Sequence, residues 1–325
     1  MPSIQHRGVG WALRALRVNS VFASPESLQR SLGSPPRLGA APTPPSKLRR
    51  DFRCQPQARQ PGGGAESWRN WPVWELTPRT FLPATTVIYF HGGAYVREAI
   101  SQHWGLVEQL LREVPARVVF PRYPLAPGTH PGPSSSDPEA APTPSSAEAT
   151  VTGAAGLIAH WAAMVGAGEV VVMGDSAGAG LALAAVQHLR DTGGGVGLPR
   201  RPVLISPWLD VTMSDPEQAA LERGDPILGR AGLAEAGRIY AGEPGVEHPF
   251  ASPLFGSMTD LPPLTVLAST GDLLLPDARR LVAAARAAGV DVDYDEQPGL
   301  FHDFALLPVP EGGAARAILV AACRP

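Results

Sequence analysis

Ser176 stands at the centre of the run 174–178, Gly-Asp-Ser-Ala-Gly, and its hydroxyl is the first candidate for covalent chemistry. The apolar run before it and the alanine-rich run after it predict a strand, a sharp turn and a helix, the context in which G-x-S-x-G presents a serine. The two glycines leave room for a strained backbone, and the helix directs its positive end at the serine. In a chain with 35 glycines the pattern alone also fits an ordinary loop. Its place between a buried strand and a helix favours a nucleophile.

A serine hydroxyl needs a general base, and His302 is our candidate for it. It lies in the segment 298–304, just after the last predicted strand, where a loop can reach over the carboxyl edge of a sheet. The chain has eight histidines, and surface or packing roles suit His6, His188 and His248. Position after the final strand separates His302 from these three.

The base needs a carboxylate to orient it, and two aspartates compete for that role. Asp272 follows a predicted strand that ends near Ser269, so it lies in a loop at the same edge as Ser176. Asp277 follows Pro276 where a helix begins, and a capping role accounts for it without catalysis. We favour Asp272, which places the three residues in the order Ser, Asp, His along the chain.

Acyl transfer also needs N–H donors for the oxyanion of its tetrahedral intermediate. The segment 92–94, Gly-Gly-Ala, forms a loop of small residues after a predicted strand that ends at Phe90, and Ala177 follows the nucleophile. Backbone N–H groups from both regions would complete an oxyanion hole. Without the serine motif, the run that begins at His91 would be read as a plain turn.

These residues fall on a regular alternation of strands and helices. Strands are predicted at 85–90, 117–120, 170–173, 203–206, 264–269 and 292–294. Helices are predicted at 149–165, after the serine motif through 188, at 277–288 and near 314–322. Strands that alternate with helices imply an α/β fold with a mostly parallel central sheet and helices on both faces.

The composition is that of a globular protein with a small-molecule partner. A length of 325 residues with 44% hydrophobic content allows a sizeable core in one large domain or two ordinary ones. A net charge of -3 and a pI near 6.2 give no overall basic footprint for nucleic acid or an anionic membrane. Cys54 and Cys323 form neither a disulfide framework nor a metal-spaced cluster, so we expect no metal and no organic cofactor. No apolar run approaches the roughly 18 residues of a membrane-spanning helix.

Three segments stand outside the regular alternation. The first fifty residues contain Glu26 as their single acid among many arginines, and Trp11 to Val18 has the spacing of a short amphipathic helix. We expect a cytoplasmic protein, although the arginine bias also fits a mitochondrial transit peptide. Residues 34–67 are rich in Pro, Gly, Arg and Ser and predict an irregular approach to the main domain. The Pro/Ser-rich segment 128–147 predicts a disordered surface insertion.

At this point the sequence resembles a known group, the hormone-sensitive-lipase-like esterases of the α/β-hydrolase fold. The matching motifs are 91–95 (HGGAY), 174–178 (GDSAG), 206–210 (SPWLD), 251–254 (ASPL) and 298–302 (PGLFH). The resemblance implies a helical cap formed by residues 1–75 together with an insertion at 211–250, and a core at 76–210 and 251–325. It also implies oxyanion donors at Gly93, Ala94 and Ala177, with His91 and Gly92 as loop-shaping residues.

The chain departs from the family pattern in places that line the expected site. Ala94 stands where the family commonly has a third glycine, and its methyl group narrows the acyl site while its N–H remains. After the Leu-Ala pair the family usually continues Pro-Glu-His, whereas this chain reads Pro-Gly-Thr-His at 127–130. The acidic residue of the site wall is therefore missing. The stretch around Asp272 matches the family's acid motif only loosely.

The hypothesis from the sequence is a serine esterase that cleaves small short- to medium-chain acyl esters. A lactonase or amidase with the same triad is the near alternative, because the residues do not specify the leaving group. A non-catalytic receptor on the hydrolase scaffold is less favoured, since such proteins typically lack the catalytic histidine and this chain has His302. An inactive protein, with its site disrupted by the insertion, is a further alternative. The sequence is also compatible with a homodimer.

Overall fold

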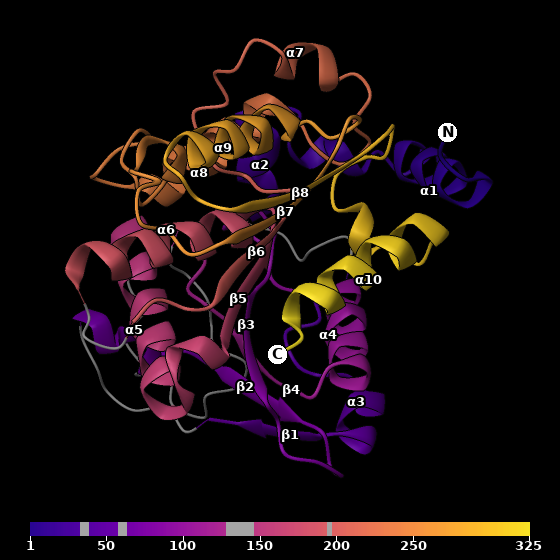
Figure 1. The fold of residues 1–325 in the computed structure, drawn as a ribbon. Coiled ribbons are helices and arrows are strands. Elements are labelled where there is room, and N and C mark those ends of the chain that lie inside the picture. Colours follow the sequence, from indigo (N-terminus) through magenta and orange to yellow (C-terminus); the bar gives the residue numbers. More distant parts are fainter. Residues whose placement is uncertain (33–38, 58–63, 128–145, 194–196) are drawn as a thin grey trace.

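The computed structural model describes residues 1–32, 39–57, 64–127, 146–193 and 197–325. Its centre is an eight-stranded sheet with the order β1-β2-β4-β3-β5-β6-β7-β8 (Figure 1). The β1–β2 and β2–β4 pairs are antiparallel, and the pairs from β4 to β8 are parallel. The strands are β1 (Arg53–Pro56), β2 (Val73–Thr77), β3 (Thr85–Phe90), β4 (Ala116–Pro121), β5 (Val170–Asp175), β6 (Arg201–Ile205), β7 (Leu264–Ser269) and β8 (Val292–Gln297).

Helices cover both faces of this sheet. In Figure 1, α3, α4 and α10 lie on one face, and α5 and α6 lie on the other. The α-helices are α1 (Ile4–Ala15), α2 (Pro25–Leu32), α3 (Ser46–Asp51), α4 (Ser101–Glu113), α5 (Ala147–Val165), α6 (Ala177–Thr192), α7 (Gln218–Leu221), α8 (Arg230–Ala241), α9 (Leu275–Ala287) and α10 (Pro310–Cys323). Short 3-10 helices occupy Val18–Val21, Gly64–Asn70, Ala167–Glu169, Pro253–Phe255 and Phe304–Leu306.

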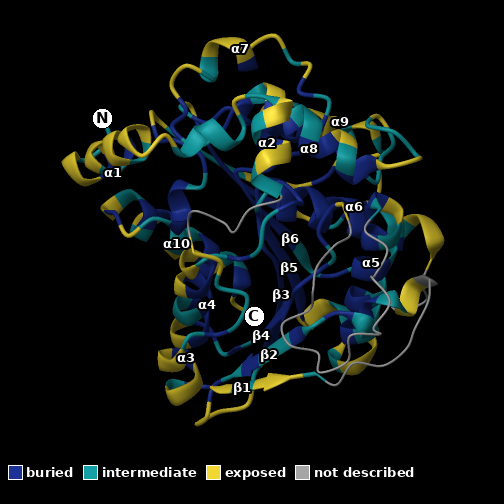
Figure 2. Cartoon of the chain, turned by 180° about the vertical axis from the view of Figure 1, so that it is seen from behind, coloured by how far each residue is buried: buried dark blue, intermediate teal, exposed yellow. Residues whose placement is uncertain are grey.

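The central strands are apolar along their whole length because both of their faces are covered. Every residue of β3, β5 and β7 is buried, which Figure 2 shows as a dark layer between the helices. In β5, Val170 and Val172 belong to the core on one face, and Val171 and Met173 belong to the core on the other. This is the side-chain alternation of a strand buried between two layers. The predicted α/β fold with a mostly parallel sheet is confirmed.

The parallel strands bring the predicted functional loops to one edge. Strands β3, β5, β7 and β8 end at Phe90, Asp175, Ser269 and Gln297, and each is followed by a loop that contains a predicted site residue. Because all four strands run in the same direction, these loops share the carboxyl edge of the sheet, where open α/β folds bind their ligands.

Segments from the N-terminus and from the insertion after β6 pack together near this edge. Helices α2 and α8 lie side by side in Figures 1 and 2. The Gly232 N–H donates to the carbonyl of Phe22 at 2.9 Å, and the Gln29 amide donates to the Glu235 carboxylate at 2.9 Å. These contacts agree with a cap built from two separate segments, and the domain boundaries stay a prediction.

The interpretation of residues 34–67 as irregular is wrong for part of that range. Helix α3 and strand β1 lie within it, and Leu48 and Phe52 belong to the core. Strand β2 and helix α4 were not predicted either. Of the predicted insertion 128–147, residues 128–145 lie outside the described part of the chain. Ser146 caps helix α5, because its hydroxyl accepts the Ala149 N–H at 3.2 Å.

Among the described residues, no helix combines the length and the apolar character that crossing a bilayer would require.

Candidate active site

Ser176 lies on a strained turn between β5 and α6. Its backbone φ is 51° and ψ is -121°, a conformation that residues other than glycine rarely adopt. The Ser176 N–H donates to the carbonyl of Ile205 at 2.8 Å, and its carbonyl accepts the Trp208 N–H at 3.1 Å. The neighbouring strand β6 and the residues after it therefore hold the turn. Helix α6 begins at Ala177, so its positive end points toward the serine.

Two glycines make this turn sterically possible. A Cβ atom at Gly174 would lie 2.3 Å from the carbonyl oxygen of Gly178, and one at Gly178 would lie 2.1 Å from that of Phe90. Both distances are far below contact distance, so a side chain at Gly174 would strike the start of α6, and one at Gly178 would strike the end of β3 and the loop after it. The G-x-S-x-G spacing thus reflects close packing of β5 on the start of α6, and of α6 on the segment around His91.

His302 and Asp272 form a buried pair at the same edge. The Nδ1 atom of His302 lies 3.0 Å from each carboxylate oxygen of Asp272. The two residues are 3% and 1% exposed, so water does not screen the pair. Burial lowers the pKa of His302, but the carboxylates of Asp272 and Asp303 outweigh it and hold that pKa well above its usual value. The Asp272 carboxylate also accepts the Leu274 N–H at 2.9 Å.

The other ring nitrogen of His302 faces a second carboxylate. Its Nε2 atom lies 3.2 Å from Oδ2 of Asp303, the next residue in the chain. Asp303 has a left-handed backbone, with φ 55°, and its N–H donates to the Ser206 hydroxyl at 3.2 Å. Among the described residues, His302 and the Ser176 hydroxyl share no hydrogen bond. The structure thus places Ser176 and the His302–Asp272 pair at one edge, with Asp303 against the nitrogen that would face the serine.

Asp277 has a different environment from Asp272, although it lies in the same segment. Its Oδ2 atom accepts the N–H groups of Leu209 and Asp210, each at 2.9 Å. Burial raises the pKa of Asp277 to about 7. The predicted capping role is wrong, because the Asp277 carboxylate accepts hydrogen bonds from the turn after β6 and from Gln218 and none from its own helix. In the described part of the chain, it forms no hydrogen bond or ion pair with His302.

The loop after β3 supplies free backbone donors. Gly93, Ala94 and Tyr95 all have positive φ, at 121°, 54° and 61°. This backbone turns away from an extended path directly after the strand. In the described part of the chain, the N–H groups of Gly93, Ala94 and Ala177 donate to no protein acceptor. The three predicted donors are therefore available for a ligand.

His91 is enclosed in the protein. Its ring stacks on Tyr123 with centroids 4.7 Å apart and on Phe120 at 5.8 Å, and its Nδ1–H donates to the carbonyl of Gly92 at 2.7 Å. The Tyr123 hydroxyl donates to the carbonyl of His91 at 2.6 Å. Burial and the nearby His103 lower the pKa of His91 to about 4, so it is neutral at ordinary pH.

A buried polar network that the sequence analysis missed holds this loop against the serine turn. Asp175, in the second position of the serine motif, accepts the Gly92 N–H at 3.0 Å, the Tyr89 hydroxyl at 2.7 Å and the His103 Nε2–H at 3.1 Å. The Nδ1 atom of His103 accepts the Ile100 N–H at 2.8 Å. Burial lowers the pKa of His103, but the Asp175 carboxylate outweighs it and raises that pKa above its usual value. His103 comes from α4, and no local pattern could have linked it to Asp175.

A further buried carboxylate, also missed, reaches the site from the insertion. Asp225 accepts the N–H groups of Ile227 and Leu228 through one oxygen and that of Leu273 through the other, at 2.8, 3.1 and 3.2 Å. Leu273 is the residue after Asp272, so the insertion supports the loop that holds the acid. Burial and the neighbouring Asp272 raise the pKa of Asp225. The Asp-Pro pair at 225–226 signals a turn, but nothing in the sequence indicates this long-range contact.

The insertion after β6 also packs on the loop after β3. Tyr240 of α8 stacks on Tyr95, with ring centroids 3.6 Å apart and an interplanar angle of 3°. Trp208 lies against the same tyrosine at 5.7 Å. The loop that begins at His91 is therefore held from one side by Asp175, through Gly92, and from the other by Trp208 and Tyr240, which pack on Tyr95.

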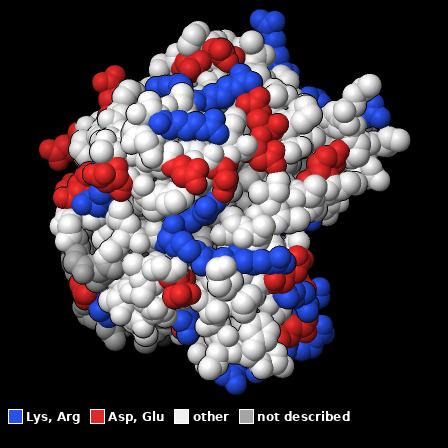
Figure 3. Space-filling view, viewed as in Figure 1, with Lys and Arg blue, Asp and Glu red and all other residues white. Residues whose placement is uncertain are grey.

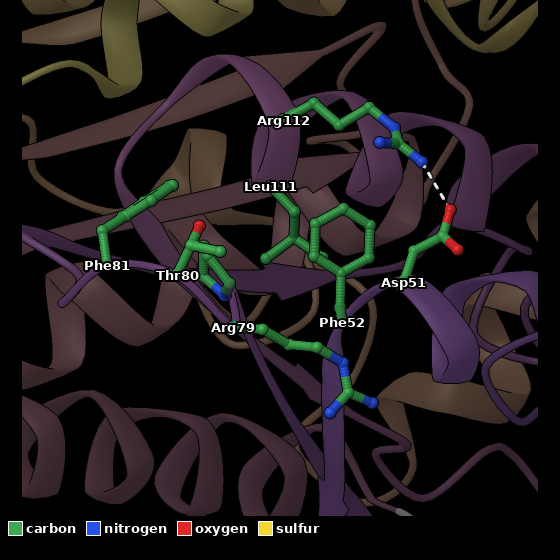
Figure 4. A pocket seen from close by; sticks show the side chains of 8 residues that line it. Asp51, Phe52, Arg79, Thr80, Phe81, Leu111 and Arg112 are labelled. Atoms are coloured by element: carbon green, nitrogen blue, oxygen red, sulfur yellow. Dashed lines mark hydrogen bonds and ion pairs between the residues drawn. The ribbon is translucent and has the colours of Figure 1, made fainter.

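A concave surface lies at the end of the sheet opposite to these loops. A pocket of about 310 Å³ is bounded by α3, the segment between β2 and β3, and the end of α4. Phe52 and Arg79 line it, and Arg112 pairs there with Asp51 at 2.7 Å (Figure 4). The pocket precedes β3, whereas the serine turn follows β5, so it lies at the amino edge of the parallel strands. None of the predicted site residues lines it.

Elsewhere in the described part of the chain, no three His, Cys, Asp or Glu side chains group as ligands of a metal ion would.

Comparisons with known proteins agree with this fold and these motifs. A family model described as the alpha/beta hydrolase fold matches residues 87–306. An acetyl-hydrolase of Streptomyces hygroscopicus is 35% identical over 217 residues, which is 67% of this chain and 67% of that protein. The esterase LipI of Mycobacterium tuberculosis is 32% identical over 71% of this chain and 69% of its own length. The crystal structure of an esterase from the bacterial hormone-sensitive lipase family superposes with a TM-score of 0.73 at 26% identity, covering 100% of this chain and 99% of that one.

The fold and the loops at the carboxyl edge define an enzyme class, the α/β-hydrolases, and the chain belongs to that family. Within it, the resemblance to the hormone-sensitive-lipase-like esterases is confirmed, and the protein is a hydrolase of the esterase and lipase type.

Proposed function

We propose that this protein hydrolyses small carboxylic esters through an acyl-enzyme formed on Ser176. The observation that carries the proposal is the buried His302–Asp272 pair, with Nδ1 to oxygen distances of 3.0 Å, at the sheet edge where Ser176 lies on its strained turn. A base oriented by a carboxylate is what a serine hydroxyl requires to attack a carbonyl.

In the first step the Ser176 oxygen forms a bond to the ester carbonyl carbon, and its proton passes to Nε2 of His302. The N–H groups of Gly93, Ala94 and Ala177 stabilise the oxyanion. This role is supported by the observation that, among the described residues, none of the three groups donates to a protein acceptor. Collapse of the intermediate breaks the bond to the alcohol, which takes the proton from His302. Water then repeats the sequence on the acyl-enzyme and releases the acid.

Asp303 adds a condition to this scheme. Its carboxylate lies 3.2 Å from the nitrogen that must accept the serine proton. Proton transfer therefore requires His302 to exchange a contact with Asp303 for one with Ser176. The same negative charge stabilises the imidazolium that forms during attack, so Asp303 both competes with the serine and strengthens the base.

Short acyl chains are the proposed preference. This preference is supported by the methyl group of Ala94, which stands where the family commonly has glycine, and by the buried, stacked rings of Tyr95 and Tyr240 beside the same loop. The acetyl-hydrolase relative supports the same choice.

The test is hydrolysis of p-nitrophenyl esters from acetate to palmitate by the full chain and by Ser176→Ala. We expect activity that is highest on the short chains and falls to background in the variant. Mass spectrometry of the wild-type chain after rapid quenching should detect an acyl adduct on Ser176. Equal activity in the Ser176→Ala variant would refute the proposed nucleophile, and a folded wild-type chain inactive on every ester would refute ester hydrolysis.

A further inference from the structure

Helix α1 has two faces with opposite surroundings. His6 and Gly10 are buried against the protein, whereas Ile4 and Trp11 are 77% and 74% exposed. Ile4, Gly8, Trp11 and Ala15 follow the spacing i, i+4, i+7, i+11, so they form one stripe along the exposed side. Leu16, at the end of the helix, is 68% exposed. Ile4 and Trp11 are the two large side chains of this stripe, and large apolar side chains exposed together on one helix face indicate a binding surface.

Positive charge borders this stripe. Arg7, Arg14 and Arg17 are exposed, and the first acidic residue of the chain is Glu26. In the described part of the chain, none of the three guanidinium groups forms an ion pair, although Arg14 donates to the carbonyl of Gly224 at 2.6 Å. Figure 3 shows the lobe at the place of α1 as mostly uncharged surface with basic groups at its edge. The net charge of -3 for the whole chain conceals this local excess.

The buried face of α1 contacts the loop that holds His302. The ring of His6 stacks on Phe301 with centroids 4.2 Å apart, and its Nε2 atom accepts the Phe301 N–H at 3.4 Å. The Ser3 hydroxyl donates to Glu311 of α10 at 2.9 Å, which holds the start of the helix. A surface bound by the outer face of α1 would therefore lie close to the candidate active site.

We propose that the exposed face of α1 docks on an anionic lipid surface and brings the active site next to esters held there. The proposal rests on the esterase function above and deepens it. An aliphatic and aromatic stripe bordered by arginines is the pattern of a helix that lies in a membrane interface. The helix is about 18 Å long at about 1.5 Å per residue, too short to span a bilayer but suited to lie along one.

Charge argues against a second copy of this chain as the occupant. A two-fold contact through α1 would place the arginines of one copy against those of the other, because such an interface uses the same patch on both subunits. An anionic lipid surface instead attracts all three arginines, and the apolar stripe is removed from water when it inserts into that surface.

The experiment is co-sedimentation of the full chain with vesicles of phosphatidylcholine alone and of phosphatidylcholine with a quarter phosphatidylglycerol. We expect binding to the anionic vesicles that weakens in high salt and falls about tenfold or more in the double variant Ile4→Ser, Trp11→Ser. The variant Arg7→Glu should also weaken binding. Leu82→Ser is the matched control, because Leu82 is 90% exposed in the segment between β2 and β3 and should leave binding unchanged.

Three outcomes would overturn the proposal: no binding by the folded chain, equal loss in Leu82→Ser, or a dimer that dissociates in the double variant. The last result would assign the face to a second copy. Activity on soluble p-nitrophenyl acetate separates this test from that of the proposed function. The double variant should retain that activity, and Ser176→Ala should lose it while binding vesicles as the wild-type chain does.

Discussion

Two loops at the carboxyl edge of the sheet each contain a histidine, and their surroundings are opposite. His91 lies between two aromatic rings, and burial lowers its pKa to about 4. His302 lies between the carboxylates of Asp272 and Asp303, which hold its pKa well above the usual value despite burial. The surroundings of the first imidazole favour its neutral form, and those of the second favour its protonated form. The environment, and not the residue type, separates the proposed loop-shaping histidine from the proposed base.

The same contrast applies to the chain around each histidine. The loop of His91 is held by hydrogen bonds to Asp175, by the stacked ring of Tyr240 and by Tyr123. These contacts fix the direction of backbone N–H groups. The loop of His302 is held by hydrogen bonds to the hydroxyls of Ser269 and Ser206, and its imidazole lies between two carboxylates. In the proposed reaction, the first loop would orient the backbone N–H donors and the second would transfer the proton.

Removing the base gives the largest expected effect. His302→Ala should lower kcat/KM on p-nitrophenyl acetate by about 10⁴-fold or more, because Ser176 then has no proton acceptor. Combining it with Ser176→Ala should add little, since the two residues act as one unit. Activity within tenfold of wild type in a variant with unchanged circular dichroism would show that another group is the base.

Asp272→Asn should have the next largest effect, a loss of about 10³- to 10⁴-fold in kcat, because an amide stabilises the wrong tautomer of His302. Asp277→Asn is the matched control, because that carboxylate is equally buried but holds the N–H groups of Leu209 and Asp210. We expect it to cost about 1–3 kcal/mol of stability in urea unfolding and to spare most of the activity. The reverse pattern would make Asp277 the triad acid.

His91→Phe tests the loop-shaping role. The aromatic ring keeps the stack between Tyr123 and Phe120 but loses the hydrogen bond to the Gly92 carbonyl. We expect a fall in kcat of about 10- to 100-fold, because the donors at Gly93 and Ala94 shift from the oxyanion position. The pH at which kcat/KM rises on the acidic side of its pH profile should not change. A shift of that pH would mean that His91 itself titrates in the reaction.

The sequence predicted the centre of this molecule better than its edges. Strand β3 was predicted at its observed bounds, and β7 likewise, because a strand buried on both faces is a continuous apolar run. Strands β1 and β2 were missed because Arg53–Pro56 and Val73–Thr77 are short, partly exposed and without a clear period. Helix α4 could have been predicted, since Trp104, Val107, Leu110 and Leu111 follow helical spacing and are buried.

The site shows the same division. The structure pairs His302 with Asp272 and places the turn of Ser176 at the same sheet edge, because strand order and chain direction determine which loops share an edge. That the three residues act together stays a prediction. Asp175 and Asp225 were missed as structural supports, since their partners are distant in sequence. Long-range hydrogen bonds of this kind leave no local pattern.

Asp303→Asn should change activity less than the other substitutions, and it tests most directly whether carboxylates distinguish His302 from His91. The carboxylate of Asp303 lies 3.2 Å from Nε2 of His302 and favours the protonated ring, so it raises the pKa of the base. Activity requires the neutral ring, and kcat/KM therefore rises with pH through that pKa. Removing the charge lowers the pKa of His302, so the acidic limb should move to lower pH by about one unit or more.

The maximal kcat/KM at high pH should fall in the same variant. A weaker base accepts the Ser176 proton less readily, and the imidazolium loses the stabilising charge of Asp303. The wild-type and variant profiles should then cross, with Asp303→Asn the faster enzyme in acid and the slower one in alkali. Loss of a purely structural contact would lower the whole profile without moving its limb. Coincident limbs would therefore show that Asp303 does not act on the base, and that Asp272 alone distinguishes His302 from His91.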